Sequence, residues 1–193
     1  MMKRLTINTR PNQKVFFSSD WHLGHRNVLQ YDSRPFNNID DHDRLIIDNW
    51  NYRLINTGNI GFLLGDFALT NERKLDEYAA QIAGTVYYVQ GNHDHKKDLK
   101  ILGRYFEILA PLQEVEINGQ LIVLCHYCMM VWNKSHRGSW HLFGHSHGNL
   151  GDLDGKRIDV GINNWNYTPV ELDLITKVMG SKKIHEVDHH VAD

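Results

Sequence analysis

The sequence predicts an α/β protein with a largely parallel sheet that is covered by helices. In the first half of the chain, short apolar runs alternate with segments of helical spacing, which is typical of parallel strands joined by helices. In the second half, polar and apolar residues alternate and two-residue turn signals occur, which indicates hairpins. A length of 193 residues fits one domain. We therefore expect a single domain over residues 1–180 and a polar tail over residues 181–193.

The first half contains three apolar runs that we expect to be strands, each followed by polar residues. They span residues 15–20, 60–66 and 85–90. Apolar spacing predicts a helix between the first two runs, with Asp40 or Asp41 as its cap and Gly58 at its end. A second helix is expected to begin after Asn71 and to stop at Gly84.

The second half predicts a hairpin and two further short strands. Polar and apolar side chains alternate over residues 114–117, and the dipeptide Asn118-Gly119 is a strong turn signal. The chain then returns as a strand over residues 121–125. Further strands are expected at residues 142–143 and 157–161.

The last helix is predicted from a capping pattern. Thr168-Pro-Val-Glu171 combines a capping box with proline at the first helical position, so the helix should begin at Thr168 and end near Gly180. The polar tail that follows contains His185, His189 and His190. We expect these to belong to a solvated chain end rather than to a metal site.

Composition and charge exclude several classes of protein. No apolar run approaches the roughly 20 residues needed to cross a bilayer, and the N-terminus does not resemble a signal peptide. The expected compartment is the cytoplasm. A net charge of −2 lacks the excess of lysine and arginine that non-specific nucleic-acid binders use. A sequence-independent DNA coat protein is therefore excluded.

The two cysteines, Cys125 and Cys128, have the C-x-x-C spacing of redox or zinc pairs. A zinc knuckle needs a second pair of ligands, and a redox pair should open a helix rather than end a strand. We therefore interpret both as buried structural thiols.

Possible ligands for metal ions gather at the predicted ends of five strands. They are Asp20, His22, Asp66, Asn92, His93, His126, His145 and His147. Ligands bind at the carboxyl ends of strands in open α/β sheets, so we expect these side chains to meet. Carboxylate, amide and imidazole groups without sulfur suit two borderline divalent ions better than one structural zinc.

These residues together carry a resemblance to the calcineurin-like metallophosphoesterases. In chain order, the motifs are Asp20-x-His22, Gly65-Asp66, Gly91-Asn-His-Asp94, His126 and Gly144-His-Ser-His147. The segments 20–27 and 159–167 further resemble a small bacterial and phage group of that superfamily. The resemblance implies a four-layer α-β-β-α sandwich of two mixed sheets flanked by helices.

The resemblance also implies a centre of two divalent ions. The first ion would be held by Asp20, His22 and His147, and the second by Asn92, His126 and His145, with Asp66 bridging both. Manganese is expected first, with iron, zinc or nickel as alternatives. A hydroxide shared by the two ions would attack phosphorus, because such a site lowers the pKa of water towards neutrality.

His93 is similar to the general acid of this family, which protonates the leaving alkoxide. Asp94 is expected to orient the His93 imidazole, as carboxylates orient other catalytic histidines. The alternative interpretation of His93 is a loop histidine bonded to the backbone.

Two neighbouring segments remain open to two interpretations each. Arg26, flanked by His25 and Asn27, would either bind a phosphate oxygen or lie on the surface at a helix start. The segment that contains Asn163, Asn164, Trp165 and Tyr167 would either stack an unpaired base or pack Trp165 under the final helix.

The expected function is therefore an enzyme, a metal-dependent phosphoesterase. Short spacings between the motifs leave no room for a capping domain, and a proton donor suits a poor alkoxide leaving group, so phosphodiesters are expected first. The alternatives are a nuclease, which the charge does not favour, and a phosphomonoesterase or nucleotidase. Outside the enzymes, the alternative is a metal-binding interaction module on the same fold. The sequence does not predict an oligomeric state.

Overall fold

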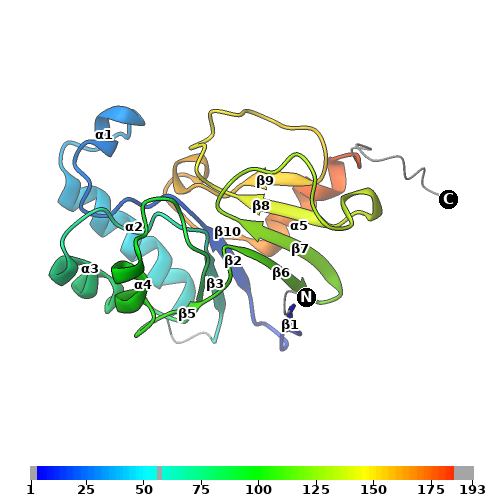
Figure 1. Cartoon of the computed structure of the whole chain (residues 1–193), viewed down its shortest axis with the longest axis horizontal. Coiled ribbons are helices and arrows are strands. Elements are labelled where there is room, and N and C mark those ends of the chain that lie inside the picture. The colour runs from blue at the N-terminus through cyan, green and yellow to red at the C-terminus, as the bar shows by residue number, and fades with distance from the viewer. Residues whose placement is uncertain (1–3, 56–57, 185–193) are drawn as a thin grey trace.

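A computed structural model describes residues 4–55 and 58–184, which form two five-stranded β-sheets packed face to face. Both sheets contain parallel and antiparallel pairs, and helices flank them, which confirms the two-sheet α/β arrangement. Figure 1 shows α2, α3 and α4 on one side of the sheet that contains β2 and β3, with the second sheet on its other side. The tail histidines His185, His189 and His190 lie outside the described residues.

Sheet 1 has the strand order β10-β2-β3-β4-β5. Its strands are β2 (Val15–Ser18), β3 (Ile60–Leu63), β4 (Thr85–Tyr88), β5 (Glu107–Ile108) and β10 (Val170–Glu171). All neighbours are parallel except β10, which runs antiparallel to β2. The three strands predicted in the first half are β2, β3 and β4. β2 and β3 are buried along their whole length, as their continuous apolar runs predict.

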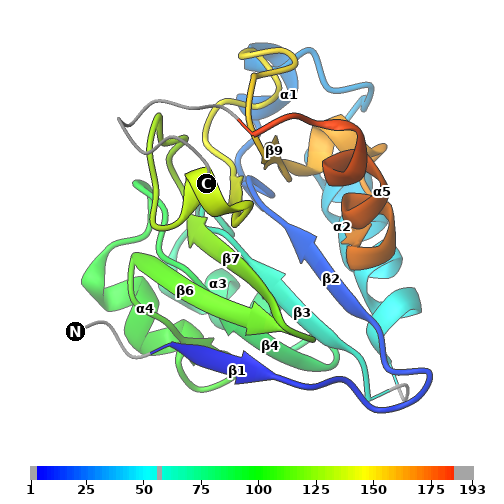
Figure 2. The same ribbon diagram turned by 90° about the vertical axis from the view of Figure 1, so that its right-hand side faces the viewer.

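Sheet 2 has the strand order β1-β6-β7-β8-β9. Its strands are β1 (Leu5–Ile7), β6 (Leu112–Ile117), β7 (Gln120–Cys125), β8 (Trp140–Phe143) and β9 (Arg157–Asp159). The predicted hairpin is β6 and β7, and its turn residues Asn118 and Gly119 have φ angles of 50° and 85°. Figure 2 shows this hairpin in front of β3 and β4 of sheet 1.

Apolar side chains from both sheets fill the space between them. Phe17 and Phe62 of sheet 1 stack with their ring centroids 5.1 Å apart, and they share a core with Ile122 and Leu142 of sheet 2. α5 (Leu172–Ser181) adds side chains to the same core at its edge, beside β2 and β10. This core fixes the two sheets relative to one another, so the strand ends of both meet at one place.

The outer face of sheet 1 is covered by helices. They are α2 (Ile39–Leu54), α3 (Glu72–Ala79) and α4 (Lys96–Leu102), whereas the short helix α1 (Val28–Tyr31) lies in the segment between β2 and α2. Trp50 of α2 is fully buried, and its ring lies against Gly61 of β3. A Cβ at Gly61 would lie 2.3 Å from two carbons of that ring, so only glycine fits the strand at this point.

The loop after β7, which contains the short 3-10 helix Ser135–Arg137, packs against β8 of sheet 2. Trp132 of this loop is buried with its ring centroid 5.4 Å from that of His141 on β8. Cys125, the last residue of β7, and Cys128, in the loop, are free and half-buried, so the expectation of buried thiols is wrong.

The cap and the end of α2 differ from the prediction. Asn38 is the cap, because its side-chain oxygen accepts a hydrogen bond of 2.8 Å from the backbone N–H of Asp41. Asp40 and Asp41 instead lie in the first turn, where carboxylates favour the helix dipole. The helix ends at Leu54 rather than Gly58, because the backbone of Ile55 is extended.

α3 begins after Asn71, as predicted, and the Asn71 side chain accepts a hydrogen bond from the N–H of Lys74. It ends at Ala79, however, before Gly84. The next residues form a tighter turn, in which the N–H groups of Gln81 and Ile82 bond to carbonyls three residues earlier.

The final helix does not begin at Thr168. Val170 and Glu171 pair with Phe17 and Phe16 of β2 as strand β10, and α5 begins only at Leu172. The capping pattern was misleading because pairing with the free edge of sheet 1 satisfies the same backbone groups. Besides β10, the elements β1, β5, α1, α4 and the 3-10 helices Ser135–Arg137 and Ile162–Trp165 were not predicted from the sequence.

His141 gives the fold a dependence on pH. Its ring is fully buried, Nδ1 donates to the carbonyl of Val123, and Nε2 accepts from the N–H of Met129, so only the neutral ring satisfies both bonds. Burial lowers the pKa of His141 from 6.5 to about 4. The folded protein thus binds a proton at His141 less readily than the unfolded chain does. The neutral ring's contribution to stability is complete above pH 6.5 and is lost as the pH falls through 4.

As the pH falls from 6.5 to 4, we expect His141 to lower the free energy of unfolding by roughly 3 kcal/mol. Urea unfolding at pH 7 and pH 5 measures the effect. The variant His141→Gln should lose part of the difference between the two pH values, and an unchanged difference would contradict the assignment.

None of the helices within residues 4–55 and 58–184 combines the length and apolar character needed to cross a bilayer.

Candidate metal centre

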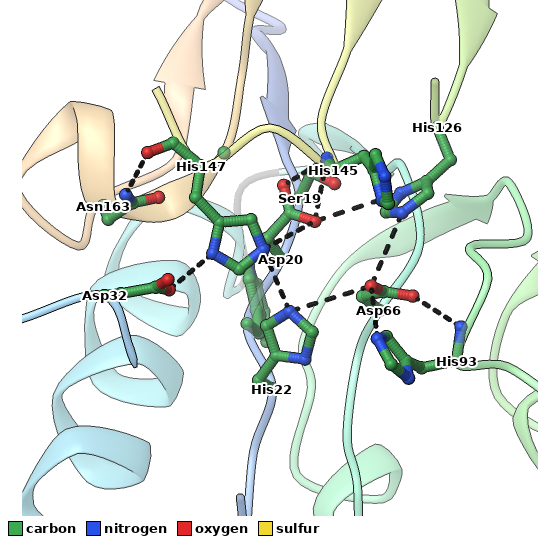
Figure 3. A network of polar contacts seen from close by, with 12 residues as sticks. Ser19, Asp20, His22, Asp32, Asp66, His93, His126, His145, His147 and Asn163 are labelled. Carbon is green, nitrogen blue, oxygen red and sulfur yellow. Dashed lines mark hydrogen bonds and ion pairs between the residues drawn. The ribbon is translucent and has the colours of Figure 1, made fainter. Parts of the chain in front are cut away.

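The candidate site lies where the carboxyl ends of strands from both sheets meet (Figure 3). β2, β3 and β4 are parallel in sheet 1, and β7 and β8 are parallel in sheet 2, so each set delivers its following loops to one edge. The candidate residues follow these strands: Asp20 and His22 after β2, Asp66 after β3, Asn92 and His93 after β4, His126 after β7, and His145 and His147 after β8.

Most of these residues have a left-handed backbone conformation that side chains rarely adopt. The φ angles lie between 48° and 66° at Asp20, His22, Asp66, His145 and His147. Aspartate and histidine are among the residues enriched in this region, yet each such residue still costs on the order of 1–3 kcal/mol. Strain of this kind persists only where the surrounding contacts fix the backbone, and it concentrates at functional sites.

Two groups of three side chains place their ligand atoms within 4.8 Å of one another. The first group is Asp20, His22 and His147, and the second group is Asp20, Asp66 and His126. Asp20 belongs to both groups, whereas the resemblance implied Asp66 as the shared carboxylate. Asp66 Oδ2 nevertheless lies 3.7 Å from His22 Nε2 of the first group, as well as 3.4 Å from His126 Nε2 of its own group.

Hydrogen bonds at the outer nitrogens orient two of the imidazoles. Nδ1 of His126 lies 2.6 Å from the carbonyl oxygen of Leu64, and Nδ1 of His147 lies 2.5 Å from Oδ2 of Asp32. Both partners accept, so both Nδ1 atoms donate, and in the neutral ring Nε2 carries the lone pair. Partners of this type fix the tautomer of histidines that bind metals.

In the first group, two imidazole nitrogens face each other, and a third nitrogen lacks a partner among the described residues. Nε2 of His22 lies 3.2 Å from Nε2 of His147. Nδ1 of His22 is buried and has no hydrogen-bond partner in the described part of the chain. Buried polar atoms rarely lack a hydrogen-bond partner, and those that do often lie at functional sites. The nitrogen and oxygen donors fit manganese, iron, zinc or nickel.

Burial opposes charge on two of the ligands. It raises the pKa of Asp20 to about 6 and lowers the pKa of His22 to about 3. His22 is therefore neutral at pH 7, which is the form that binds a metal ion. The ionised Asp20 is costly without a nearby cation, because it is removed from water.

Asp66 and His126 form an ion pair when no metal is bound. Although burial opposes both shifts, their mutual hydrogen bond lowers the pKa of Asp66 and raises that of His126. A metal ion at His126 must displace this proton, so binding there is expected to release one proton.

The Asp20 carboxylate is held by the loop after β8. The backbone N–H of His145 lies 3.0 Å from each of its two oxygens. Gly144 makes this approach feasible, because a Cβ there would lie 2.1 Å from Ser19 Oγ and 2.5 Å from Asp20 Oδ2. The loops after β2 and β8 are therefore joined at the shared ligand.

The remaining candidates lie at the mouth of the site. The ring of His145 is exposed and contacts the rings of His126 and Tyr127, outside both three-residue groups. Asn92 Oδ1 is 2.9 Å from His126 Nε2, on the side of the second group. The side chain of His93 is 48% exposed, with Nε2 4.0 Å from Asp66 Oδ2.

Asp94 does not orient His93, so this expectation is wrong. Its Oδ2 atom accepts hydrogen bonds from the N–H groups of Asp66 and Gly91 and from the Tyr88 hydroxyl, at 2.6–3.1 Å. The carboxylate is therefore committed to joining the loops after β3 and β4. His93 is positioned through its backbone N–H, which donates to Asp66 Oδ1 at 3.0 Å.

Two residues that contact the ligands were missed in the sequence, Asp32 and Arg34. Arg34 is buried and donates to Asp32, which in turn accepts from His147. They follow a helix of only four residues and belong to none of the strand-end motifs. The only sequence signal is a pair of opposite charges next to Pro35 and Phe36.

The residues with two interpretations are now placed. Trp165 packs against the core between the sheets, and its Nε1 donates to the carbonyl of Asp159. Tyr167 is buried, so its ring cannot stack an exposed base. Asn163 donates to the carbonyl of His147 and so supports the loop after β8. Arg26 is exposed, and its contact with phosphate stays a prediction.

Comparisons with known proteins show a similar fold and a relative in sequence. No profile of a known protein family matches the chain. A solved structure of a protein of unknown function, AQ665 from Aquifex aeolicus, has a TM-score of 0.67 at 22% identity, over 86% of this chain and all of that chain. At this identity the likeness shows the fold alone. The uncharacterized protein MJ1445 of Methanocaldococcus jannaschii is 31% identical over 180 residues, covering 89% of this chain and 94% of the relative. The chain therefore belongs to the same family as MJ1445.

Proposed function

We propose that the protein is a phosphoesterase with two divalent metal ions and a calcineurin-like fold. The observation that carries this proposal is the pair of three-residue groups that share Asp20 at the carboxyl ends of strands from both sheets. When bound, the two ions would polarise phosphoryl oxygens and lower the pKa of water. Manganese is the first ion to test, with iron, zinc and nickel as alternatives.

The protein's own residues would hold the ions and move one proton. His22 and His147 would present Nε2 to one ion, and His126 would present Nε2 to the other. Asn92 and His145, which both contact His126 at the mouth of the site, would complete the second set of ligands. His93 is the exposed imidazole nearest Asp66, so it would reach the leaving oxygen of a bound ester and protonate it.

Phosphodiesters are the substrates that this arrangement favours. Asn92, His93 and His145 are exposed at the rim, so a phosphate group can approach from solvent. A proton donor matters most for an alkoxide, which is a poor leaving group. The net charge of −2 provides no excess of lysine and arginine for a nucleic-acid backbone, which favours small diesters over polymers.

The experiment that tests the proposal is hydrolysis of bis(p-nitrophenyl) phosphate and p-nitrophenyl phosphate by metal-stripped protein, with and without Mn²⁺. We expect turnover that requires the ion, is faster for the diester, and is lost in Asp66→Asn. If two ions bind but Mn²⁺, Fe²⁺, Zn²⁺ and Ni²⁺ all fail to support turnover, the proposal is wrong and a metal-binding interaction module replaces it.

His93→Ala is expected to lower turnover by roughly 10²- to 10⁴-fold, the usual contribution of a general acid. Metal content should not change, because His93 Nε2 lies outside both three-residue groups. The loss of turnover is measured for a p-nitrophenyl ester and for an alkyl ester, whose leaving group is more basic. The loss should be larger for the alkyl ester, and equal losses for both would exclude proton donation by His93.

A further inference from the structure

Arg34 lies buried beneath the loop that follows β2, and its side chain has no exposure to solvent. A guanidinium group has five N–H donors, and all five are used here. Nε and Nη2 donate to Oδ2 of Asp32 at 3.1 and 2.9 Å, and Nη2 also donates to the carbonyl of Asp20 at 2.9 Å. Nη1 donates to the carbonyl of Trp21 at 3.0 Å and to Nε2 of His42 at 2.8 Å.

The bonds to Asp32 connect Arg34 with a ligand of the first group. Asp32 Oδ2 accepts from both Arg34 and Nδ1 of His147. Because the Arg34 guanidinium is fixed by its other bonds, the carboxylate is fixed as well. The His147 ring is thereby held with Nε2 towards Nε2 of His22.

The bonds to the two backbone carbonyls act on the other ligands of the first group. Asp20 and His22 have φ angles of 60° and 53°, which are costly for these residues. Arg34 binds the carbonyls of Asp20 and Trp21, which lie between and beside these strained positions. The guanidinium of Arg34 therefore stabilises the backbone that carries two ligands and also orients the ring of the third.

The bond to His42 anchors this arrangement in the helices. A guanidinium can only donate, so Nε2 of His42 accepts and Nδ1 donates to Oδ1 of Asp43 at 2.8 Å. Asp43 Oδ2 accepts from the Gly24 N–H at 2.9 Å and from the Tyr78 hydroxyl. The loop is thus held at both ends by residues anchored to α2.

The second group is held differently. His126 is oriented by the carbonyl of Leu64, and the backbone N–H of His93 binds Asp66 Oδ1. Neither bond involves Arg34 or Asp32. Only Asp20 is common to both groups, and its carboxylate is fixed by the N–H of His145.

We propose that Arg34, acting through Asp32 and the carbonyls of Asp20 and Trp21, is the positioning residue of the first metal-ion site. The inference rests on the metal binding contained in the proposed function. Loss of the network should weaken the binding of one ion and leave the binding of the other unchanged, because other hydrogen bonds hold the second group.

The test is calorimetric titration of the metal-stripped, full-length protein with Mn²⁺. The unmodified protein should bind two ions. In Asp32→Asn and Arg34→Lys, one of the two affinities should fall by roughly 10- to 100-fold, as is typical when a partner of a metal ligand is lost, while the other is retained. The matched controls are Asp152→Asn and Arg73→Lys, whose side chains are 90% exposed, and both should bind like the unmodified protein.

A second readout separates positioning from general stability. In the metal-free protein, ¹⁵N spectra of the histidine rings should show His147 with its proton on Nδ1, and this preference should be lost in Asp32→Asn. Two retained affinities in both variants, or a fall of both affinities together, would overturn the inference while leaving the proposed function intact. Failure of the unmodified protein to bind Mn²⁺ would instead remove the proposed function.

Discussion

Replacing Asp20 with asparagine is expected to abolish metal-dependent turnover, by roughly 10³-fold or more, because two ions would lose their shared carboxylate. Metal ions contribute several kcal/mol to the stabilisation of charged transition states, and each 1.36 kcal/mol is a tenfold change in rate. Asparagine keeps the size of the side chain and tolerates the left-handed backbone at this position. The variant therefore removes charge with little change in shape.

Stability distinguishes this effect from unfolding. Burial raises the pKa of Asp20 to about 6, so its ionised carboxylate opposes folding of the metal-free chain at pH 7. Asparagine carries no charge, and the metal-free variant should be at least as resistant to urea as the unmodified protein. Asp48→Asn, at an exposed position of α2, is the control for activity. A metal-free variant that is clearly less stable would contradict this account.

Trp50→Ala is expected to lower the free energy of unfolding by about 3–5 kcal/mol, the range for large aromatic residues removed from a core. Trp50 is fully buried against Gly61, and its Nε1 donates to the carbonyl of Ala83. The glycine cannot fill the cavity that the ring would leave. Urea unfolding measures the change.

Tyr52→Ala is the matched control, because this aromatic residue of the same helix is 80% exposed. Its stability should change by no more than about 0.5 kcal/mol. Trp50 also packs edge-on against Trp21, with ring centroids 5.1 Å apart, and Trp21 lies between Asp20 and His22. We therefore expect Trp50→Ala to weaken metal binding as well. Full metal affinity in a destabilised variant would show that this core does not support the ligands.

The strands, and the polar residues that follow them, are evident in the sequence for one physical reason. A strand buried on both faces must be apolar throughout, so the polar residue that ends it is conspicuous, as at Asp20 and Asp66. The Asn118-Gly119 turn is equally clear, because few other residue pairs accept its backbone angles. These local signals place most of the candidate site.

Signals that depend on tertiary contacts were missed or misread. Thr168 has the local features of a helix start, but the free edge of β2 makes the next residues a strand. Asp94 stands next to His93 in sequence, yet its carboxylate joins two other loops. Arg34 has significance only through partners that the fold brings together, and no local pattern distinguishes it from a surface arginine.

The left-handed backbone at five of the candidate ligands has a consequence for how this family could evolve. Aspartate, asparagine and histidine are the side-chain-bearing residues that best accept this conformation, and they are also good ligands for borderline divalent ions. Backbone geometry and metal chemistry therefore select the same few amino acids at Asp20, His22, Asp66, His145 and His147. A single change from aspartate to asparagine would leave the backbone satisfied while removing a charge. If the proposed function is right, descendants that no longer bind metal but keep the fold would be one mutation away, with asparagine at position 20 or 66.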